Sequence, residues 1–422
     1  MPFVLYLLGL AVFAQGTSEF MLSGLMPDIA ADLDVSVPTA GALTSAFAVG
    51  MIIGAPLMAM LSLRWPRRRA LLVFLTVFLL VHVLGAVTTS YAVLLATRVV
   101  AALANAGFLA VALATATAMV EPNAKGRATS ILLGGTTIAC VAGVPGGALL
   151  GQVWGWRSAF WAVALVSVPA VLAIWRSVPA DGAAGLGADG GAGADTGSGV
   201  RGIGVGVRGE LGALRTPRLL LVLTLGALVN GATFCTFTYL APLATEVAGI
   251  GEGWVPLLLA LFGLGSFIGV SAAGRVADVR PLQVLLAGGV ALLAGWVVFA
   301  LVAGGPGAAV VLVLVQGALS FAVGSTLISQ ALYAATGAPT LAGAFATAAL
   351  NTGAALGPWI GGRAIAADLG YRSPLWVSAL LVALALATAG TAAGLRRRGV
   401  TRGRIRGAAP GMADPAPTSL DR

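Results

Sequence analysis

One acidic side chain in this sequence is placed where it could bind and release a proton. Of the fifteen Asp and Glu residues, only Glu19 lies well inside an apolar run, and carboxylates buried in lipid usually face a cavity and have a function. Burial disfavours the charged form of a carboxyl, whereas a nearby cation favours it. Arg98 is a cation in another apolar run, at the same expected depth of about six residues, or ~9 Å, below one surface. We predict that Glu19 and Arg98 couple transport to protons. The alternative is that they form a static ion pair that only stabilises helix packing.

The sequence contains few residues that could form a metal, cofactor or catalytic site. The chain has one histidine, His82, and two cysteines, Cys140 and Cys235, which leaves no ligand set for zinc or haem. One deep acid and one histidine also offer few acid–base pairs to an enzyme, and no P-loop pattern for ATP occurs. We therefore expect no metal, no cofactor and no catalysis, and a structural role for His82.

Amides, hydroxyls and aromatic rings inside the apolar runs supply the candidate ligand contacts. Few charges together with such groups would suit a neutral, partly aromatic small molecule. Each of them could instead serve in a hydrogen bond between helices or in packing. The predicted substrate-cavity residues are Gln15, Asn105, Asn230, Thr233, Phe234, Tyr239, Gln316 and Ser320.

The elements that must position these residues are membrane-spanning helices. The 422 residues are 59% hydrophobic and only 9% charged, whereas soluble domains are near a quarter charged, so a water-soluble globule is excluded. A helix crosses ~30 Å of hydrocarbon with about 20 apolar residues. Twelve apolar runs are long enough, at 3–25, 38–62, 70–88, 92–119, 128–151, 158–175, 219–244, 254–273, 282–303, 308–331, 342–362 and 374–394.

The sequence repeats itself at one constant offset, which indicates two similar halves. The offset aligns Pro27 with Pro242, Pro66 with Pro281, Trp161 with Trp376, and Gly155-Trp156-Arg157-Ser158 with Gly370-Tyr371-Arg372-Ser373. The predicted fold is an all-α membrane protein with twelve transmembrane helices in two pseudo-symmetric six-helix halves. Two parallel repeats of this kind are typical of transporters that rock around a site at mid-membrane depth.

The domain boundaries follow from composition. The halves are residues 1–176 and 218–395. Between them, residues 177–217 are too rich in Gly, Ala and Asp to bury a core and are expected to be a flexible linker. Residues 396–422 form a basic and then Pro-rich tail that we expect to be disordered.

The basic residues predict the orientation. The net charge of +9 is interpreted as a topological signal rather than as a nucleic-acid surface. Connections on one side hold most of the cations, and positive loops remain inside the cell, so both termini are expected in the cytoplasm and the chain in the cell membrane. The cations on that side include Arg64, Arg67, Arg68, Arg69, Lys125, Arg127, Arg275 and Arg280.

Two loop or helix motifs carry further predictions. Gly274 to Pro281 resembles a G-x-x-x-D-R loop, in which Asp278 and arginines could form a charge latch that opens in one conformation. A purely topological basic loop is equally compatible with it, and the first-half copy has Leu63 where Asp278 would align. The predicted cytoplasmic latch consists of Arg64, Arg67, Arg68, Asp278 and Arg280.

The second motif is a glycine-rich stretch of the fifth run. Glycines at this density allow close helix approach, and a proline removes a backbone donor and kinks the helix. The stretch resembles the antiporter motif of drug exporters, and a stricter Gly-Pro-x-x-Gly-Gly pattern stands at Gly357 to Gly362 in the eleventh run. The predicted motif residues are Gly143, Pro145, Gly146, Gly147 and Gly151.

The run Thr17 to Leu33, TSEFMLSGLMPDIAADL, resembles the first-helix signature of the twelve-helix drug:proton antiporters of the major facilitator superfamily. With Arg98, Gly143 to Gly151 and Gly155-Trp156-Arg157, the resemblance covers the whole chain and is greatest to actinobacterial chloramphenicol resistance exporters. It implies proton-driven efflux by alternating access, with Glu19 and Arg98 in coupling. The implied partners are a small, largely uncharged drug, protons and the lipid bilayer, with no nucleic acid, and the chain is expected to be a monomer.

Three other functions remain open from the sequence alone. An exporter of sugars or other small metabolites would have the same fold. A membrane-embedded enzyme would need more acid–base groups than the chain offers. A sensor would need an output module, for which residues 177–217 are too rich in glycine.

Overall fold

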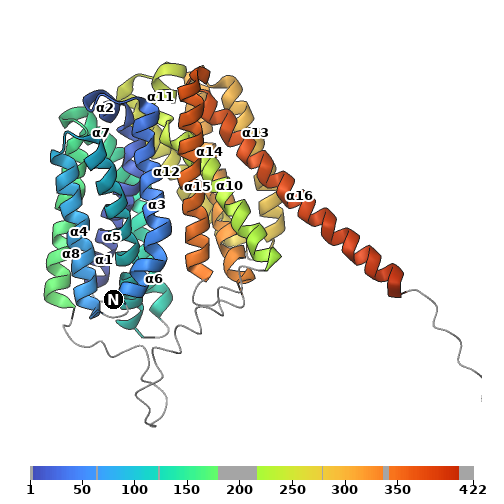
Figure 1. Cartoon of the computed structure of the whole chain (residues 1–422), viewed down its shortest axis with the longest axis horizontal. Helices are drawn as coiled ribbons and strands as arrows, with labels where there is room; N and C mark the ends of the chain where they lie inside the picture. Colours follow the sequence, from blue (N-terminus) through green and yellow to red (C-terminus); the bar gives the residue numbers. More distant parts are fainter. Residues whose placement is uncertain are drawn as a thin grey trace, which may run out of the picture.

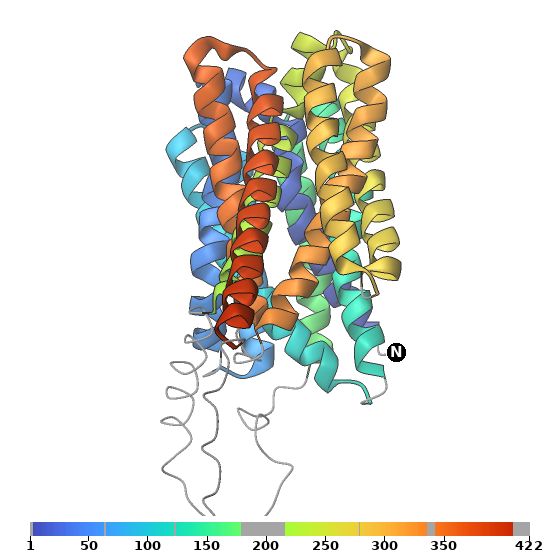
Figure 2. The same cartoon turned by 90° about the vertical axis from the view of Figure 1, so that its right-hand side faces the viewer.

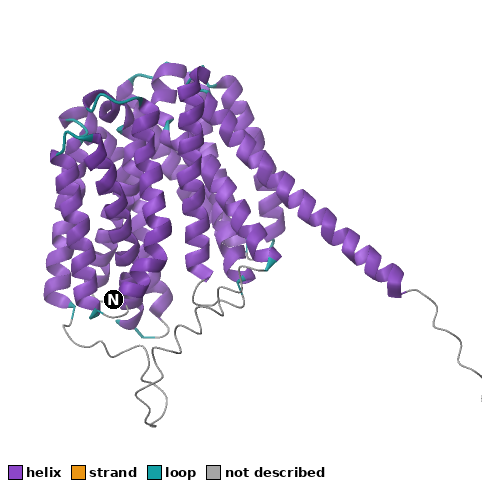
Figure 3. Cartoon of the chain, viewed as in Figure 1, coloured by secondary structure: helices purple, strands orange, loops and turns teal. Residues whose placement is uncertain are grey.

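The computed structural model describes residues 3–62, 65–121, 124–178, 216–277, 279–335 and 342–407. Arg64 and Asp278 of the predicted latch, most of the predicted linker and the last part of the tail lie outside the described residues. The described part consists of helices joined by loops and contains no strand, which confirms the predicted fold class (Figure 3).

The first half contains six spanning segments. Two of them are made of more than one helical piece, and a short helix follows the first span. The elements are α1 (Phe3–Phe20) continued by η1 (Met21–Gly24), α2 (Met26–Asp32), α3 (Val37–Ser62), α4 (Arg67–Val87), α5 (Tyr91–Ala118), α6 (Lys125–Ile138) continued by η3 (Ala139–Gly143) and α7 (Val144–Trp154), and α8 (Arg157–Ser177).

The second half repeats this order. Its elements are α10 (Pro217–Thr238) followed by α11 (Leu240–Pro242) and η5 (Leu243–Val247), η6 (Glu252–Trp254) leading into α12 (Val255–Val276), α13 (Pro281–Val302), α14 (Pro306–Ala334), α15 (Ala342–Ala364) continued by η7 (Ile365–Leu369), and α16 (Ser373–Gly407). In the described part of the chain, eleven segments are long and apolar enough to cross a membrane. The twelfth is α15, whose 23 residues include polar Thr347, Asn351 and Thr352.

The expected disorder of the tail differs from the structure over residues 396–407. Here α16 remains helical to Gly407 and leaves the bundle as a diagonal rod (Figure 1). Arginine is a good helix former, and no proline occurs between Pro374 and Pro410 to stop the helix.

Each half has its own apolar core, and the halves lie side by side (Figures 1 and 2). They meet along two seams, where α3 packs on α15, and where η3 and α7 pack on α12. Val144 and Ala148 of α7 belong to the core of the second half although they come from the first. The segment α6–η3–α7 therefore links the halves.

The two ends of the bundle differ in charge. We call the basic end the one where α1 begins, which holds Arg67, Arg68, Arg69, Arg218, Arg275 and Arg280 near the ends of α4, α10, α12 and α13. The acidic end is the opposite one, where α2 and α11 lie (Figure 1), and it holds Asp28, Asp32, Glu246 and Glu252.

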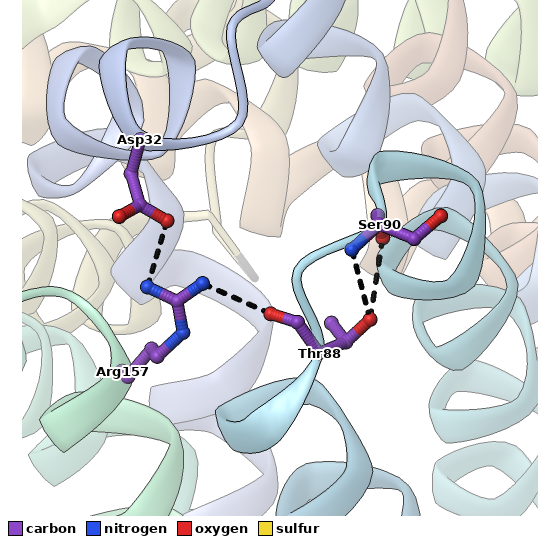
Figure 4. A network of polar contacts seen from close by, with 4 residues as sticks. All are labelled: Asp32, Thr88, Ser90 and Arg157. Carbon is purple, nitrogen blue, oxygen red and sulfur yellow. Dashed lines mark hydrogen bonds and ion pairs between the residues drawn. The ribbon is translucent and has the colours of Figure 1, made fainter.

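A polar network closes the first half at the acidic end (Figure 4). A guanidinium nitrogen of Arg157, at the start of α8, lies 2.7 Å from a carboxylate oxygen of Asp32 in α2. Arg157 also donates to the carbonyl of Thr88 at 3.0 Å, and the Thr88 hydroxyl accepts from the backbone N–H of Ser90 at 3.1 Å. Because the Arg157 and Asp32 side chains are 30% and 42% exposed, the ion pair contributes only about 0–1 kcal/mol. Its main effect is to fix how α2 and α8 meet.

The contacts between the halves lie from mid-membrane to the acidic end. The Ser45 hydroxyl of α3 donates to the carbonyl of Ala355 in α15 at 2.7 Å. The Gln152 amide of α7 donates to the carbonyl of Glu252 at 2.5 Å. Tyr239 fits against Gly41 of α3 and Gly362 of α15, where an added Cβ would clash with its hydroxyl. The structure is therefore closed at the acidic end.

Candidate functional site

The guanidinium of Arg98 is buried in the first half and bound by one residue of α1. Its side chain, on α5, is 1% exposed. Nη1 donates to the Ser18 hydroxyl at 2.8 Å, and Nη2 donates to the Ser18 carbonyl at 2.9 Å. The guanidinium also lies over the ring of Phe47, 4.5 Å from its centroid, which favours a cation. Ser18 precedes Glu19, so Arg98 binds α1 beside the predicted proton carrier.

The hydrogen bonds continue from Ser18 to His82. The Ser18 oxygen lies 2.6 Å from Nε2 of His82, and Nδ1 of His82 lies 2.7 Å from the carbonyl of Phe78 on the same helix, α4. A carbonyl can only accept, so Nδ1 donates to it and carries a proton. Because Ser18 accepts from Arg98, its own hydroxyl proton points to Nε2. The sequence-based interpretation assigned His82 a structural role, and the structure connects it to Arg98 through one hydroxyl.

Glu19 and Arg98 form no ion pair with each other in the described structure, although they lie within electrostatic range. The direct pairing that their equal depth makes possible is therefore not made in this conformation. Nε of Arg98 is buried and has no hydrogen-bond partner. The guanidinium thus keeps an unused donor that another acceptor could take.

An aromatic cavity lies between the halves, one residue from Glu19. Phe20 of α1 faces Phe234 and Phe237 of α10, with ring centroids 5.7 and 6.4 Å apart. The free volume is about 10 Å³, which is room for roughly one water molecule. A drug-sized ligand needs the halves to separate here. The lining residues are Phe20, Cys140, Val144, Thr233, Phe234, Phe237, Phe262, Ser266 and Phe321.

Two of the predicted substrate-cavity residues, Thr233 and Phe234, line this cavity. Four others use their polar atoms within their own half. The amide of Asn230 donates to the Leu350 carbonyl at 2.7 Å, that of Gln316 to the Leu292 carbonyl at 3.3 Å, that of Asn105 to the Met51 sulfur at 3.6 Å, and the Tyr239 hydroxyl to the Pro358 carbonyl at 2.9 Å.

The remaining two predicted cavity residues, Gln15 and Ser320, have buried polar atoms that make no hydrogen bond. Both side-chain polar atoms of Gln15 and the hydroxyl of Ser320 are buried without a hydrogen-bond partner, and so is Oε1 of Gln316. Unpaired buried polar groups are costly. Gln15, Ser320 and the carbonyl oxygen of the Gln316 side chain are therefore the best placed of the set to gain a partner when the conformation changes or a ligand enters.

The glycine-rich motif forms the seam between the fifth span and the helix of Glu19. Gly143 packs on Thr17, Gly147 on Met21, and Gly151 on Leu25, and an added Cβ would clash with Thr17 and Leu25. Both sets recur every four residues, so they are facing rows of two helices. Gly146 faces open space, and Pro145 follows the widened helical turn η3. The motif thus holds α1 against a segment that also contacts the second half.

A glycine of α12 makes the matching close contact from the second half. An added Cβ at Gly263 would clash with the backbone carbonyl of Cys140 and lie 3.0 Å from Cα of Val141. Backbone atoms cannot move aside as a flexible side chain can. The approach of the halves at mid-membrane therefore depends on this position.

We expect Gly263→Ala to reduce transport at least tenfold, because the halves can no longer meet at Cys140. The matched control is Gly324→Ala in α14, where an added Cβ meets nothing within 4 Å. Initial transport rates at equal amounts of folded protein in the membrane measure the difference. Equal activity of the two variants would mean that this close contact is not needed.

The predicted cytoplasmic latch is only partly described. Arg67 and Arg68 begin α4, and Arg68 donates to the carbonyl of Trp175 at the end of α8, within the same half. Arg280 is exposed and precedes α13. Since Arg64 and Asp278 lie outside the described residues, the latch stays a prediction.

A second cavity, of about 520 Å³, lies at the acidic end between the halves. Its lining includes Asp28, Gln152, Glu246, Glu252 and Tyr371. Burial raises the pKa of Asp28, and the negative charge of Glu252 raises it further. The charged form of Asp28 is therefore disfavoured at this position, but only weakly, because Asp28 is exposed and solvent screens these effects.

Two halves of spanning helices around a small central cavity, with one acid and one cation at depth, are the features of a membrane transporter. The comparisons with known proteins agree. Residues 8–352 match the family model described as Major Facilitator Superfamily, and the chain belongs to that superfamily.

Relatives match nearly the whole chain. A chloramphenicol resistance protein of Streptomyces lividans is 57% identical over 389 residues, which cover 92% of this chain and 96% of that one. The inner membrane transport protein YdhP of Escherichia coli is 33% identical over 380 residues, covering 90% and 93%. Among solved structures, a bacterial homologue of the human lysosomal transporter Spinster, inward-facing and unoccupied, has a TM-score of 0.74 at 18% identity and covers 92% of this chain and 95% of that one. That likeness concerns the fold alone.

Proposed function

We propose that this transporter exports a small, largely uncharged drug of the chloramphenicol type in exchange for protons, by alternating access. The substrate class is supported by the 57% identity to the chloramphenicol resistance protein of Streptomyces lividans over 92% of the chain. The observation that carries the coupling is the position of Glu19. It lies between Ser18, which binds Arg98, and Phe20, which lines the aromatic cavity between the halves.

The exchange follows because bound drug and protonated Glu19 exclude each other in the same cavity. A neutral Glu19 lets the cavity close, because no unpaired charge is left between apolar surfaces. Entry of the drug separates Phe20 from Phe234 and Phe237 and hydrates the acid, which releases its proton. Re-protonation from the other side then resets the carrier, so drug and proton move in opposite directions.

In our proposal the basic end lies in the cytoplasm together with both termini, as the positive-inside rule requires. The drug then leaves at the acidic end, and protons enter there. No cofactor takes part, and the chain works as a monomer in the cell membrane. Chloramphenicol is neutral, so exchange for one proton moves one charge and gains ~2.3 kcal/mol per 100 mV of membrane potential.

The first test is drug accumulation in cells. We expect cells that express the protein to accumulate less chloramphenicol than control cells, and an uncoupler to abolish the difference. A parallel arm with labelled sugars tests the alternative metabolite exporter. Unchanged chloramphenicol accumulation with folded protein in the membrane would remove the drug assignment, and efflux that persists in uncoupled, ATP-replete cells would remove the proton.

A further inference from the structure

We propose that Arg98 has two alternative binding positions on α1, and that Ser18 together with His82 forms the one that it occupies while Glu19 is neutral. His82 is then a positioning residue of the coupling step. The inference uses Glu19 as the proton carrier and in that respect rests on the proposed function. It adds the element that senses whether Glu19 is charged.

The first argument is the way in which Arg98 is held. A buried cation is costly unless it is paired and hydrogen-bonded. Among the described residues, the guanidinium contacts no carboxylate; it makes two hydrogen bonds to Ser18 and lies over the ring of Phe47. Its Nε–H is unused. The cation is therefore stable in this position, and its free Nε–H can still donate to a stronger acceptor.

The second argument is the proton of the Ser18 hydroxyl. Arg98 donates to that oxygen, so the hydroxyl proton must point elsewhere, and Nε2 of His82 lies 2.6 Å away. The Phe78 carbonyl holds the ring by Nδ1, and Phe78 and Phe160 pack beside it with centroids 4.1 and 5.8 Å away. His82 therefore turns the Ser18 oxygen toward Arg98. Without an acceptor there, the hydroxyl proton would be free to rotate toward the cation.

The third argument is the distance that the cation must move. Ser18 and Glu19 are consecutive, so they differ by ~1.5 Å along the helix axis and by about 100° around it, and Glu19 already lies within electrostatic range of the guanidinium. Hydrogen bonds between two charged groups are roughly twice as strong as those between neutral ones. A charged Glu19 therefore draws the guanidinium from Ser18, and a neutral Glu19 returns it. The charge of Glu19 thereby determines which residue of α1 Arg98 binds, and so how α1 and α5 are connected.

The charged and titratable groups around Glu19 are few. Arg98 approaches it from α5, His82 lies behind Ser18 on α4, and Cys140 of η3 lies within electrostatic range of it at the seam with the second half. The Cys140 thiol is neutral in an apolar environment. Among these described neighbours, Arg98 is the group whose position the charge of Glu19 can change.

The single histidine of the chain makes a direct test possible. We would label the histidine ring with ¹⁵N and record its nitrogen signals in nanodiscs, with no drug present, across the pH range in which the protein stays folded. We expect a neutral ring with its proton on Nδ1 and Nε2 accepting at low pH, and a shift of the Nε2 signal as Glu19 ionises. In Glu19→Gln, the low-pH signal should persist throughout.

Three results would overturn the proposal. They are a proton on Nε2 of the low-pH state, an Nε2 signal that does not respond to pH in the unaltered protein, and the same response in Glu19→Gln. Because no drug is present, these results are independent of whether chloramphenicol is the substrate.

A transport measurement separates positioning from packing. His82→Phe keeps an aromatic ring but removes the acceptor, whereas His82→Gln restores an acceptor for Ser18. We expect the ratio of proton-driven efflux to downhill drug exchange to fall at least tenfold in His82→Phe and to recover in His82→Gln, at equal thermal stability. If both variants lose efflux and exchange in proportion, His82 only packs, and the inference is wrong.

Discussion

Replacing Glu19 by Gln should abolish uphill drug efflux while leaving the protein able to bind drug and exchange it downhill. Gln mimics the protonated acid, so the cavity beside Phe20 can still open and close, but no proton is carried. Glu19→Asp should retain part of the efflux, because it keeps the charge and shortens the reach by one methylene. The measurement is drug efflux against a concentration gradient at several pH values.

The matched control for Glu19 is Glu121→Gln, which changes an exposed acid after α5. It should leave efflux and its pH dependence as they are. If Glu19→Gln pumped drug uphill with unaltered pH dependence, Glu19 would be structural. The proton carrier would then have to be sought at Asp278, or at Asp28 and Asp32 of the acidic end.

Replacing Arg98 by Lys should reduce proton-driven efflux at least tenfold. The ammonium group cannot donate to the Ser18 hydroxyl and carbonyl from one plane while lying flat over Phe47. Loss of one hydrogen bond to a charged group costs roughly 1.5–3 kcal/mol, which corresponds to a factor of about ten or more. Initial rates of proton-driven efflux at equal amounts of folded protein provide the measurement.

Arg157→Lys is the control for charge alone. Arg157 also lies over an aromatic ring, that of Trp156, and it also binds a carbonyl, but its side chain is 30% exposed. We expect it to change efflux little. Equal efflux by Arg98→Lys and the unaltered protein would show that the shape of the guanidinium is not used, and would contradict the arrangement around Ser18.

Much of the fold could be predicted because its signals are local. Length and apolarity identify each span, and the boundaries differ from the structure by a few residues at most ends. The extension of α16 to Gly407 was missed because basic residues after an apolar run mark a membrane surface and not the end of a helix. The η3 turn was also not predicted, although Pro145 directed attention to this part of the fifth span.

The candidate site was less predictable, because it depends on contacts between distant parts of the chain. Depth along the helices placed Glu19 and Arg98 at one level, but it could not show that Arg98 turns to Ser18. The one available sign for His82 was a polar ring in the apolar run 70–88. Burial of Gln15 and Ser320 without partners could not be foreseen from residue type either.

The cavity lining shows the same limit. Thr233 and Phe234 were chosen by their span and residue type, and they line the aromatic cavity. Phe20, Phe262 and Phe321 line it as well, but the sequence does not reveal the rotation of their helices. Tyr239, chosen on the same grounds, instead fills the contact with Gly41 and Gly362.

The most direct test of proton-driven drug export uses the purified protein in lipid vesicles. An imposed pH gradient should drive labelled chloramphenicol against its concentration gradient, toward the side with more protons. A membrane potential that pulls protons in the direction opposite to drug movement should increase the rate. The Glu19→Gln protein should only equilibrate the drug. Drug movement that is the same with and without the pH gradient, or the same in Glu19→Gln, would contradict the account.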